Sequence, residues 1–314
     1  MAPLFEPRRP LGRTGFVATR LGIGDLADRS VPIEQCVATA RRAIDAGLNV
    51  IDTAPGYEDG YSEQIVGRAV AGVRDRMFVI DKIDHPAEPV APQVEGSLGR
   101  LGLDHVDLFL FHGVSDLTTW QALVAPGGGM EQLGSCIRQG KCRFRGISSH
   151  HPDVLAAALA SGLCDALMFA IGPYCHPRYV SEILPEARRR GVGTVCFKTF
   201  GAGKLLQDTE GYGRPLSQRP RGKVSSGGVP APADSVLPRL GVEECLRYAM
   251  TRDPDVALLG LSFPNEQEAA FAAASAFRPC TAAELASIEA RALDAVRQKG
   301  RCWWNPPDWQ PHEE

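Results

Sequence analysis

Short apolar runs alternate with longer amphipathic segments from about residue 20 to residue 276 of the chain. The runs are rich in Val, Ile, Leu and Phe without strict polar alternation, which is typical of parallel strands buried on both faces. The pattern predicts strands over Thr19–Gly24, Asn49–Asp52, Met77–Lys82, His105–Phe111, Arg143–Ser148, Ala166–Ala170, Gly193–Phe197 and Val256–Leu261.

The segments between these runs have the period of amphipathic helices, and several of them end at a glycine. Helices are predicted over Ile33–Ala46, Ser62–Ala71 and Ser181–Arg190, followed by Gly47, Gly72 and Gly191. A row of eight strand-helix units without a change of composition favours a closed (β/α)8 TIM barrel, because an open doubly wound sheet more often uses about five or six strands. We therefore expect residues 1–314 to form one domain.

Three stretches break the pattern and are predicted to be irregular. They are Gly113–Gly129, a long loop near residues 204–241, and a C-terminal tail over 300–314. The long loop contains RPRGKVSSGGVPAPAD, whose Pro, Gly and Ser content cannot build a core, so we expect it to be exposed, as either a disordered insertion or a functional lid. The tail carries Trp303, Trp304 and Trp309, which need the barrel wall or the mouth of a pocket to pack against.

Composition and charge narrow the class of protein. The chain has 314 residues, 44% of them hydrophobic and 23% charged, which is enough for one large core. A net charge of -3 without a run of Lys or Arg argues against a nucleic-acid partner. No apolar stretch reaches the length of a signal peptide or a membrane span, so we expect no membrane association and a cytoplasmic location. Nine cysteines without a CxxC pair suit reduced thiols, and no metal site is expected.

Polar residues at the ends of the predicted strands are the candidates for chemistry, because active sites of parallel barrels lie at the carboxyl ends of the strands. Asp52, Lys82 and His112 each close an apolar run, and Tyr57 follows Asp52 by five residues. Each one alone could be a turn cap, a loop aromatic, a solvated strand end or a core histidine. Their shared place on three neighbouring strands favours a common pocket.

Two of these segments resemble the aldo-keto reductase family. DTAPGYEDGYSEQIVGRAV is similar to the family's D-T-A-x-x-Y-G-x-S-E-x-x-x-G segment, with a small insertion around Asp59 and Gly60. DLFLFH resembles the family's strand that ends in a catalytic histidine. The likeness runs from Leu11 to about Phe277.

The resemblance implies that Asp52, Tyr57, Lys82 and His112 form the family's catalytic tetrad. Hydride transfer from a nicotinamide to a carbonyl carbon leaves an oxygen that needs a proton donor. Tyr57 would be this acid, and the ammonium of Lys82 would lower its pKa. Asp52 would orient Lys82, and His112 would bind the carbonyl oxygen.

The resemblance also implies a cofactor site. RGISSHH resembles the family's G-x-S-N, so Ser148 should face the nicotinamide amide. VCFKTFGAGKLL resembles Y-S-P-L-x-x-G-x-L, which places Phe197 against the nicotinamide and residues 198–204 around the pyrophosphate. The expected cofactor residues are Gly24, Asp25, Ser148, Ser149, Met168, Phe197, Lys198, Gly201, Gly203, Leu205, Gly260, Ser262 and Gln267.

Several of these positions depart from the family's pattern. Ser149 stands in place of Asn, and Met168 stands in place of the glutamine that holds the carboxamide. Phe263 occupies the place where a basic residue often grips the 2′-phosphate, and Ala269 and Ala270 replace a Glu-Asn pair. NADP(H) is the family's usual cofactor, and NAD(H) stays an alternative because phosphate recognition favours Arg or Lys.

The expected function is therefore an NAD(P)-dependent oxidoreductase that reduces a small aldehyde or ketone, or oxidises the corresponding alcohol. Two alternatives remain open at this point. One is a nicotinamide-binding regulatory subunit, and the other is a redox-neutral isomerase or lyase with tightly bound NAD(P). The presence of all four tetrad residues favours an enzyme. Substrate identity is a property of loops in such barrels and does not follow from these residues, and neither does an oligomeric state.

Overall fold

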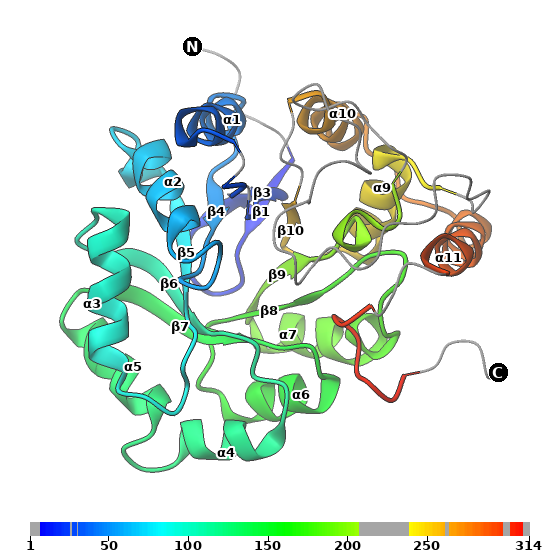
Figure 1. The fold of residues 1–314 in the computed structure, drawn as a ribbon. Coiled ribbons are helices and arrows are strands. Elements are labelled where there is room, and N and C mark those ends of the chain that lie inside the picture. The colour runs from blue at the N-terminus through cyan, green and yellow to red at the C-terminus, as the bar shows by residue number, and fades with distance from the viewer. Residues whose placement is uncertain are drawn as a thin grey trace.

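A closed barrel of parallel strands lies at the centre of the chain, with helices around it (Figure 1). The structure is a computed structural model that describes residues 7–25, 27–29, 31–206, 239–260, 264–297 and 302–309. The order around the barrel is β10-β3-β4-β5-β6-β7-β8-β9. The strands are β3 Leu21–Ile23, β4 Val50–Asp52, β5 Phe78–Ile83, β6 Val106–Phe111, β7 Cys142–Ser148, β8 Ala166–Ala170, β9 Gly193–Phe197 and β10 Val256–Leu259. The predicted (β/α)8 barrel is confirmed.

Helices lie on the outside of the barrel, most of them between successive strands. They are α1 Ile33–Asp45, α2 Tyr61–Val70, α3 Val90–Leu101, α4 Leu117–Val124, α5 Gly129–Arg138, α6 Pro152–Ser161, α7 Leu184–Arg190, α9 Val242–Arg252, α10 Pro264–Ser275 and α11 Ala282–Val296, with short turns η1 Arg74–Arg76, η2 Tyr179–Ile183 and η3 Gly201–Gly203. The third predicted helix is a π-helical turn, η2, that continues into α7. Gly47, Gly72 and Gly191 have φ values of 102°, 76° and 66°. This left-handed backbone explains why glycine follows each predicted helix.

The prediction that residues 113–129 are irregular is wrong over α4. Asp116 caps this helix, because its carboxylate accepts a hydrogen bond from Thr119 N at 2.7 Å. Trp120 and Leu123, three residues apart, are buried on one face of the helix. The cap and the apolar spacing were both present in the sequence.

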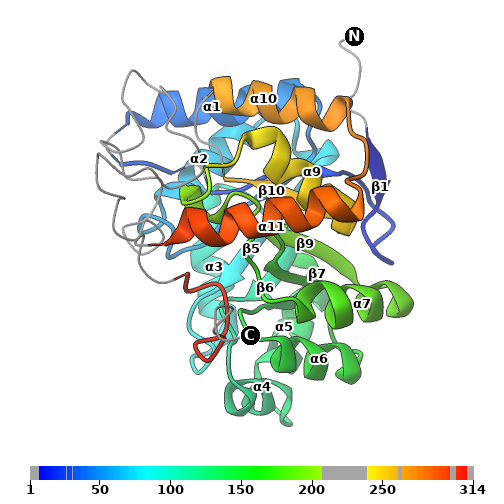
Figure 2. The same cartoon turned by 90° about the vertical axis from the view of Figure 1, so that its right-hand side faces the viewer.

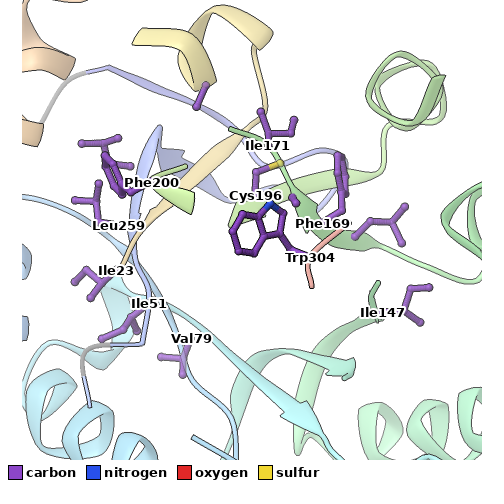
Figure 3. Close-up of a cluster of buried hydrophobic side chains, with 14 of the residues drawn as sticks. Ile23, Ile51, Val79, Ile147, Phe169, Ile171, Cys196, Phe200, Leu259 and Trp304 are labelled. Carbon is purple, nitrogen blue, oxygen red and sulfur yellow. The ribbon is translucent and has the colours of Figure 1, made fainter. Parts of the chain in front are cut away.

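Two apolar clusters divide the core. The larger one lies between the strands and the helices, and Figure 3 shows part of it. The smaller one fills the inside of the barrel and includes Val50, Phe78, Ile80, Leu108 and Leu110. Because side chains alternate between the two faces of a strand, residues two positions apart, such as Phe78 and Ile80, both belong to the inner cluster.

A hairpin before the barrel covers the amino ends of the strands. It consists of β1 Arg8–Pro10 and β2 Val17–Thr19, which pair antiparallel. Phe16 lies against Phe78 at the start of β5, with ring centroids 5.1 Å apart. At Gly12, φ is 47° and a Cβ atom would lie 2.3 Å from Gly193 N. The hairpin therefore packs backbone to backbone on the barrel, and Figure 2 shows it at the opposite end of the barrel from the red C-terminal segment.

The C-terminal segment 302–309 packs at the carboxyl end of β8 and β9. Trp304 is fully buried, and Figure 3 shows its indole beside Phe169, Ile171 and Cys196. Its Nε1 donates a hydrogen bond to Tyr174 O at 2.9 Å. The expectation that the tail tryptophans pack against the barrel wall or the mouth of a pocket is thus confirmed for Trp304.

The long predicted loop near 204–241 lies mostly outside the described residues, and its described ends meet in a bridge between Leu206 and Leu240. Among the residues that the structure describes, no helix is both long enough and apolar enough to cross a membrane.

Candidate active site

Strand alternation carries the candidate residues to the mouth of the barrel. In β5, the inner residues Phe78 and Ile80 are followed two positions later by Lys82. In β6, Leu108 and Leu110 are followed in the same way by His112. Val50 in β4 is followed by Asp52. Because the strands are parallel and adjacent in the barrel, their inward positions at the carboxyl ends converge, as the sequence predicted.

Lys82 and Asp52 form a buried ion pair. Their side chains are 1% and 3% exposed, and Lys82 Nζ lies 2.6 Å from Asp52 Oδ1. The ammonium also donates to Thr53 O at 2.7 Å. Burial alone would lower the pKa of Lys82, but Asp52 opposes this through its charge and its hydrogen bond, and the net shift is upward. Lys82 is therefore a fixed cation at neutral pH.

Tyr57 lies above this pair on the turn between β4 and α2. Its ring centroid is 4.5 Å from Lys82 Nζ. The turn is tight, because Tyr57 N donates to Ala54 O, and Glu58 and Asp59 follow with φ values of 51° and 53°. Such left-handed backbone is strained in non-glycine residues, and strained backbone clusters at active sites and ligand clamps. The insertion noted in the sequence falls on this strained turn.

The pKa of Tyr57 is raised above its ordinary value. Burial is the largest cause, and the carboxylates of Asp52 and Asp25 add to it, while the ammonium of Lys82 opposes it. The charge of Lys82 lowers the pKa of Tyr57, as expected, but its effect is smaller than that of burial. The net shift of the Tyr57 pKa is upward because removal of water from the phenol dominates. Tyr57 is therefore a neutral phenol at neutral pH.

His112 lies beside Tyr57, with ring centroids 5.5 Å apart and an angle of 78° between the rings. Its Nδ1 is 2.5 Å from Asp84 Oδ1. Asp84 directly follows β5, and its Oδ2 accepts a hydrogen bond from Gly56 N at 2.6 Å. Partial burial would raise the pKa of Asp84, but the hydrogen bond and the charge of His112 lower it. The sequence reasoning missed Asp84, although it continues the inward series of Phe78, Ile80 and Lys82.

Five of the remaining predicted cofactor residues lie on barrel strands or directly after them. Gly24 follows β3, and Gly260 follows β10. Ser148 and Phe197 occupy inward positions at the ends of β7 and β9, and Met168 faces inward from the middle of β8. Ser148 Oγ accepts a hydrogen bond from Gly113 N at 2.8 Å, and Met168 belongs to the inner cluster. Phe197 is partly exposed, as a ring that could stack on a planar group must be.

The segment after β9 has features that fit a phosphate-bearing ligand. Lys198, Gly201 and Gly203 have positive φ values of 64°, 55° and 83°. Thr199 Oγ1 is buried and has no hydrogen-bond partner among the described residues. A buried hydroxyl without a partner is costly unless a ligand satisfies it. Leu205 is buried behind this segment, and the sequence reasoning did not single out Thr199.

Of the other predicted cofactor residues, Ser149, Gln267 and Asp25 make contacts within the protein, and Ser262 is not described. Ser149 Oγ accepts a hydrogen bond from His151 N at 3.0 Å, so its hydroxyl oxygen is used in a local turn. Gln267 is buried, and its amide nitrogen donates to Thr39 O of α1 at 3.4 Å, while its Oε1, like Thr199 Oγ1, has no hydrogen-bond partner among the described residues. Ser262 lies outside the described residues, as does Phe263. Asp25 accepts a hydrogen bond from Ala27 N, and its charge acts on Tyr57.

Comparison with known proteins gives a consistent result. Residues 19–292 match the model of the Aldo/keto reductase family. L-galactose dehydrogenase of Arabidopsis thaliana is 27% identical over 282 residues, which cover 83% of this chain and 85% of the relative.

Two solved structures share the fold. The holo form of aldo-keto reductase AKR11C1 from Bacillus halodurans has a TM-score of 0.68 and 23% identity, over 90% of this chain and 95% of the other. An aldo-keto reductase from Klebsiella pneumoniae in complex with NADPH has a TM-score of 0.65 and 21% identity, over 91% and 94% of the two chains. At these identities the likeness establishes the architecture.

Proposed function

The chain belongs to the aldo/keto reductase family, and from this premise we propose that it reduces a small aldehyde or ketone with a reduced nicotinamide dinucleotide. The observation that carries the proposal is the arrangement at the barrel mouth. Lys82, held by Asp52, lies 4.5 Å from the ring centroid of Tyr57, and the Tyr57 ring also contacts His112. The comparisons lend no support to a regulatory subunit or to a redox-neutral enzyme.

The bound nicotinamide would supply a hydride to the carbonyl carbon, and the residues of the chain would handle the oxygen. Tyr57 would donate its phenolic proton to that oxygen, so that the carbonyl becomes an alcohol and the nicotinamide is oxidised. The nearby ammonium of Lys82 would stabilise the phenolate that remains. A hydrogen bond from the ring of His112 would hold the oxygen in place. Because burial keeps Tyr57 neutral, the resting site suits reduction, and alcohol oxidation should need a more alkaline pH.

The cofactor would lie across the ends of β7, β8 and β9. Ser148 and Phe197 would contact the nicotinamide, and the segment from Lys198 to Leu205, with the buried hydroxyl of Thr199, would hold the pyrophosphate. Met168 offers no amide to the carboxamide, so this end would be held by fewer hydrogen bonds than in relatives with glutamine. We propose NADP(H) as the main cofactor, in line with the NADPH complex of the Klebsiella pneumoniae protein. NAD(H) is the alternative.

Tyr57→Phe tests the proposed acid. In a screen of small aldehydes and ketones with NADPH and NADH, read as nicotinamide absorbance, we expect this variant to lower kcat by about 100-fold or more. Cofactor binding, measured by fluorescence titration, should be unchanged. Tyr61→Phe is the matched control, because the Tyr61 hydroxyl donates to Val31 O on the outside of the barrel. Full turnover in Tyr57→Phe would overturn the assignment, and equal affinities for NADPH and NADH would refute a dedicated phosphate site.

A further inference from the structure

Asp84 bridges two parts of the candidate site that lie on different loops. One carboxylate oxygen contacts Nδ1 of His112 at 2.5 Å, and the other accepts the amide of Gly56 at 2.6 Å. Gly56 immediately precedes Tyr57. A single carboxylate is thus hydrogen-bonded to the histidine and to the turn that carries the phenol.

The turn that carries Asp84 is itself held in place. The side chain of Gln93 on α3 accepts a hydrogen bond from His85 N at 3.1 Å and donates one to His85 O at 3.0 Å. The backbone N–H and C=O of His85, the residue after Asp84, are therefore both hydrogen-bonded to a side chain of α3. A carboxylate anchored in this way can set the orientation of its two partners, as hydrogen-bonded groups behind a reacting side chain generally do.

The contact to Nδ1 also decides which protons His112 carries. A carboxylate can only accept, so Nδ1 of His112 must carry a proton. In a neutral imidazole, Nε2 would then hold a lone pair and would repel a carbonyl oxygen. Nε2 can donate to that oxygen only when the ring carries both protons, and the negative charge of Asp84 stabilises this form.

We propose that Asp84 is a positioning residue that keeps His112 doubly protonated and aligns it with the Tyr57 turn, so that a cationic imidazole binds the carbonyl oxygen of the substrate. This inference rests on the proposed carbonyl reduction. It gives His112 a charged partner, Asp84, that is not one of the four tetrad residues.

The other charged and titratable groups around His112 limit the effect. Lys82 at the end of β5, paired with Asp52, carries a positive charge that disfavours a second cation. Tyr57 is neutral at neutral pH. His150 after β7 is also neutral, because burial and the nearby charges of Lys198 and His112 lower its pKa to about 3. Asp84 is thus the group that offsets the positive charge on the ring.

The pH dependence of reduction tests the proposal. In Asp84→Asn, which keeps the shape of the side chain, His112 should lose its second proton at lower pH. We expect the alkaline decline of kcat/KM to move to lower pH by about 1 to 2 units. Asp104→Asn is the matched control, because Asp104 Oδ1 lies 2.6 Å from Nδ1 of His105 in an exposed pair at the amino end of β6. The control should leave the profile unchanged, whereas an unmoved profile in Asp84→Asn would overturn the proposal.

A second measurement does not depend on turnover. In the full chain labelled with 15N-histidine, the ring signals of His112, assigned by their loss in His112→Gln, should show protons on both nitrogens near neutral pH. Asp84→Asn should convert them to those of a neutral ring. A neutral wild-type ring, with its single proton on either nitrogen, would refute the role of Asp84. If the wild-type chain reduced no carbonyl in the screen, the proposed function would fail, and these spectra would still decide the state of His112.

The Gly56 contact has its own test. A Cβ atom at position 56 would lie 2.5 Å from Asp84 Oδ2, so Gly56→Ala should displace this hydrogen bond and leave the charge of Asp84 in place. We expect kcat to fall by about 10-fold, since small misplacement of a reacting group is costly, while the pH of the alkaline decline stays where it is. An unchanged kcat would show that Asp84 does not align the Tyr57 turn.

Discussion

Removal of the ammonium of Lys82 should destabilise the whole fold, apart from its effect on activity. Lys82→Met leaves the carboxylate of Asp52 only 3% exposed and without its partner at 2.6 Å. It also removes the hydrogen bond to Thr53 O. Breaking a buried ion pair from one side costs roughly 3 to 5 kcal/mol, because the remaining charge cannot return to water. We expect this loss in the free energy of unfolding.

The double variant separates the cost of the orphaned charge from the value of the pair. In Lys82→Met with Asp52→Asn, no charge remains buried at this position, so most of the loss should be recovered. The assay is urea-induced unfolding at pH 7, followed by far-ultraviolet circular dichroism and by tryptophan fluorescence. The two probes should give the same midpoint if the barrel unfolds in one step.

An exposed pair provides the control. Lys141 Nζ lies 2.5 Å from Glu95 Oε1, but the Glu95 side chain is 61% exposed. Because water solvates either partner when the other is removed, Lys141→Met should cost less than about 1 kcal/mol. If Lys82→Met and Lys141→Met unfolded at the same urea concentration, the reasoning from burial would be refuted.

Three further predictions concern stability and use the same unfolding assay. Gly67→Ala should destabilise the fold by about 1 to 3 kcal/mol, because the added Cβ would lie 1.9 Å from Leu101 O. Gly99→Ala, where α3 leaves open space for a Cβ, should stabilise it by about 0.5 to 1 kcal/mol. If both variants changed the free energy of unfolding in the same direction, the reasoning would be contradicted. Trp304→Ala removes a fully buried indole and should cost about 3 to 5 kcal/mol, and a loss below about 1 kcal/mol would show that the tail is dispensable. Burial and the charge of Glu63 raise the pKa of Asp81. The native state therefore keeps the carboxyl proton of Asp81 to a higher pH than the unfolded chain does, and the free energy of unfolding falls as pH rises. Asp81→Asn should therefore stabilise more at pH 8 than at pH 5, and an equal effect at both would contradict the shift.

The strands could be predicted closely because they are buried on both faces. The bounds of β8 and β9 agree with the sequence prediction at both ends. The limits of β3 are less well predicted, since residues 19 and 20 belong to the β1–β2 hairpin and to the bend after it. Apolar runs indicate that a segment is buried, but hydrogen bonding to a neighbouring strand decides where the strand ends.

The tail and the outer helices were harder to predict for a different reason. The packing of Trp304 depends on Tyr174 and Tyr179, which lie more than a hundred residues earlier in the chain. No local pattern reports such a contact. The helix α11 continues beyond the eight repeating units, and its capping box at Thr281 and Glu284 was a local signal that the repeat pattern obscured.

Asp84 shows how far strand alternation can be extended toward the site. The even positions 78, 80 and 82 of β5 face the inside of the barrel, and one more step along the same series gives residue 84, which contacts His112. The rule that located Lys82 therefore also locates its neighbour, provided that the alternation is followed past the last hydrogen-bonded residue of the strand. Tyr57 cannot be found in this way, because it lies on a turn whose left-handed residues at 58 and 59 redirect the chain. Residues that continue a strand are thus predictable from alternation, and those on strained turns require a sequence motif. A catalytic group on such a turn needs a fixed partner to hold its position, and Asp84, bonded to the amide of Gly56, is placed to provide it.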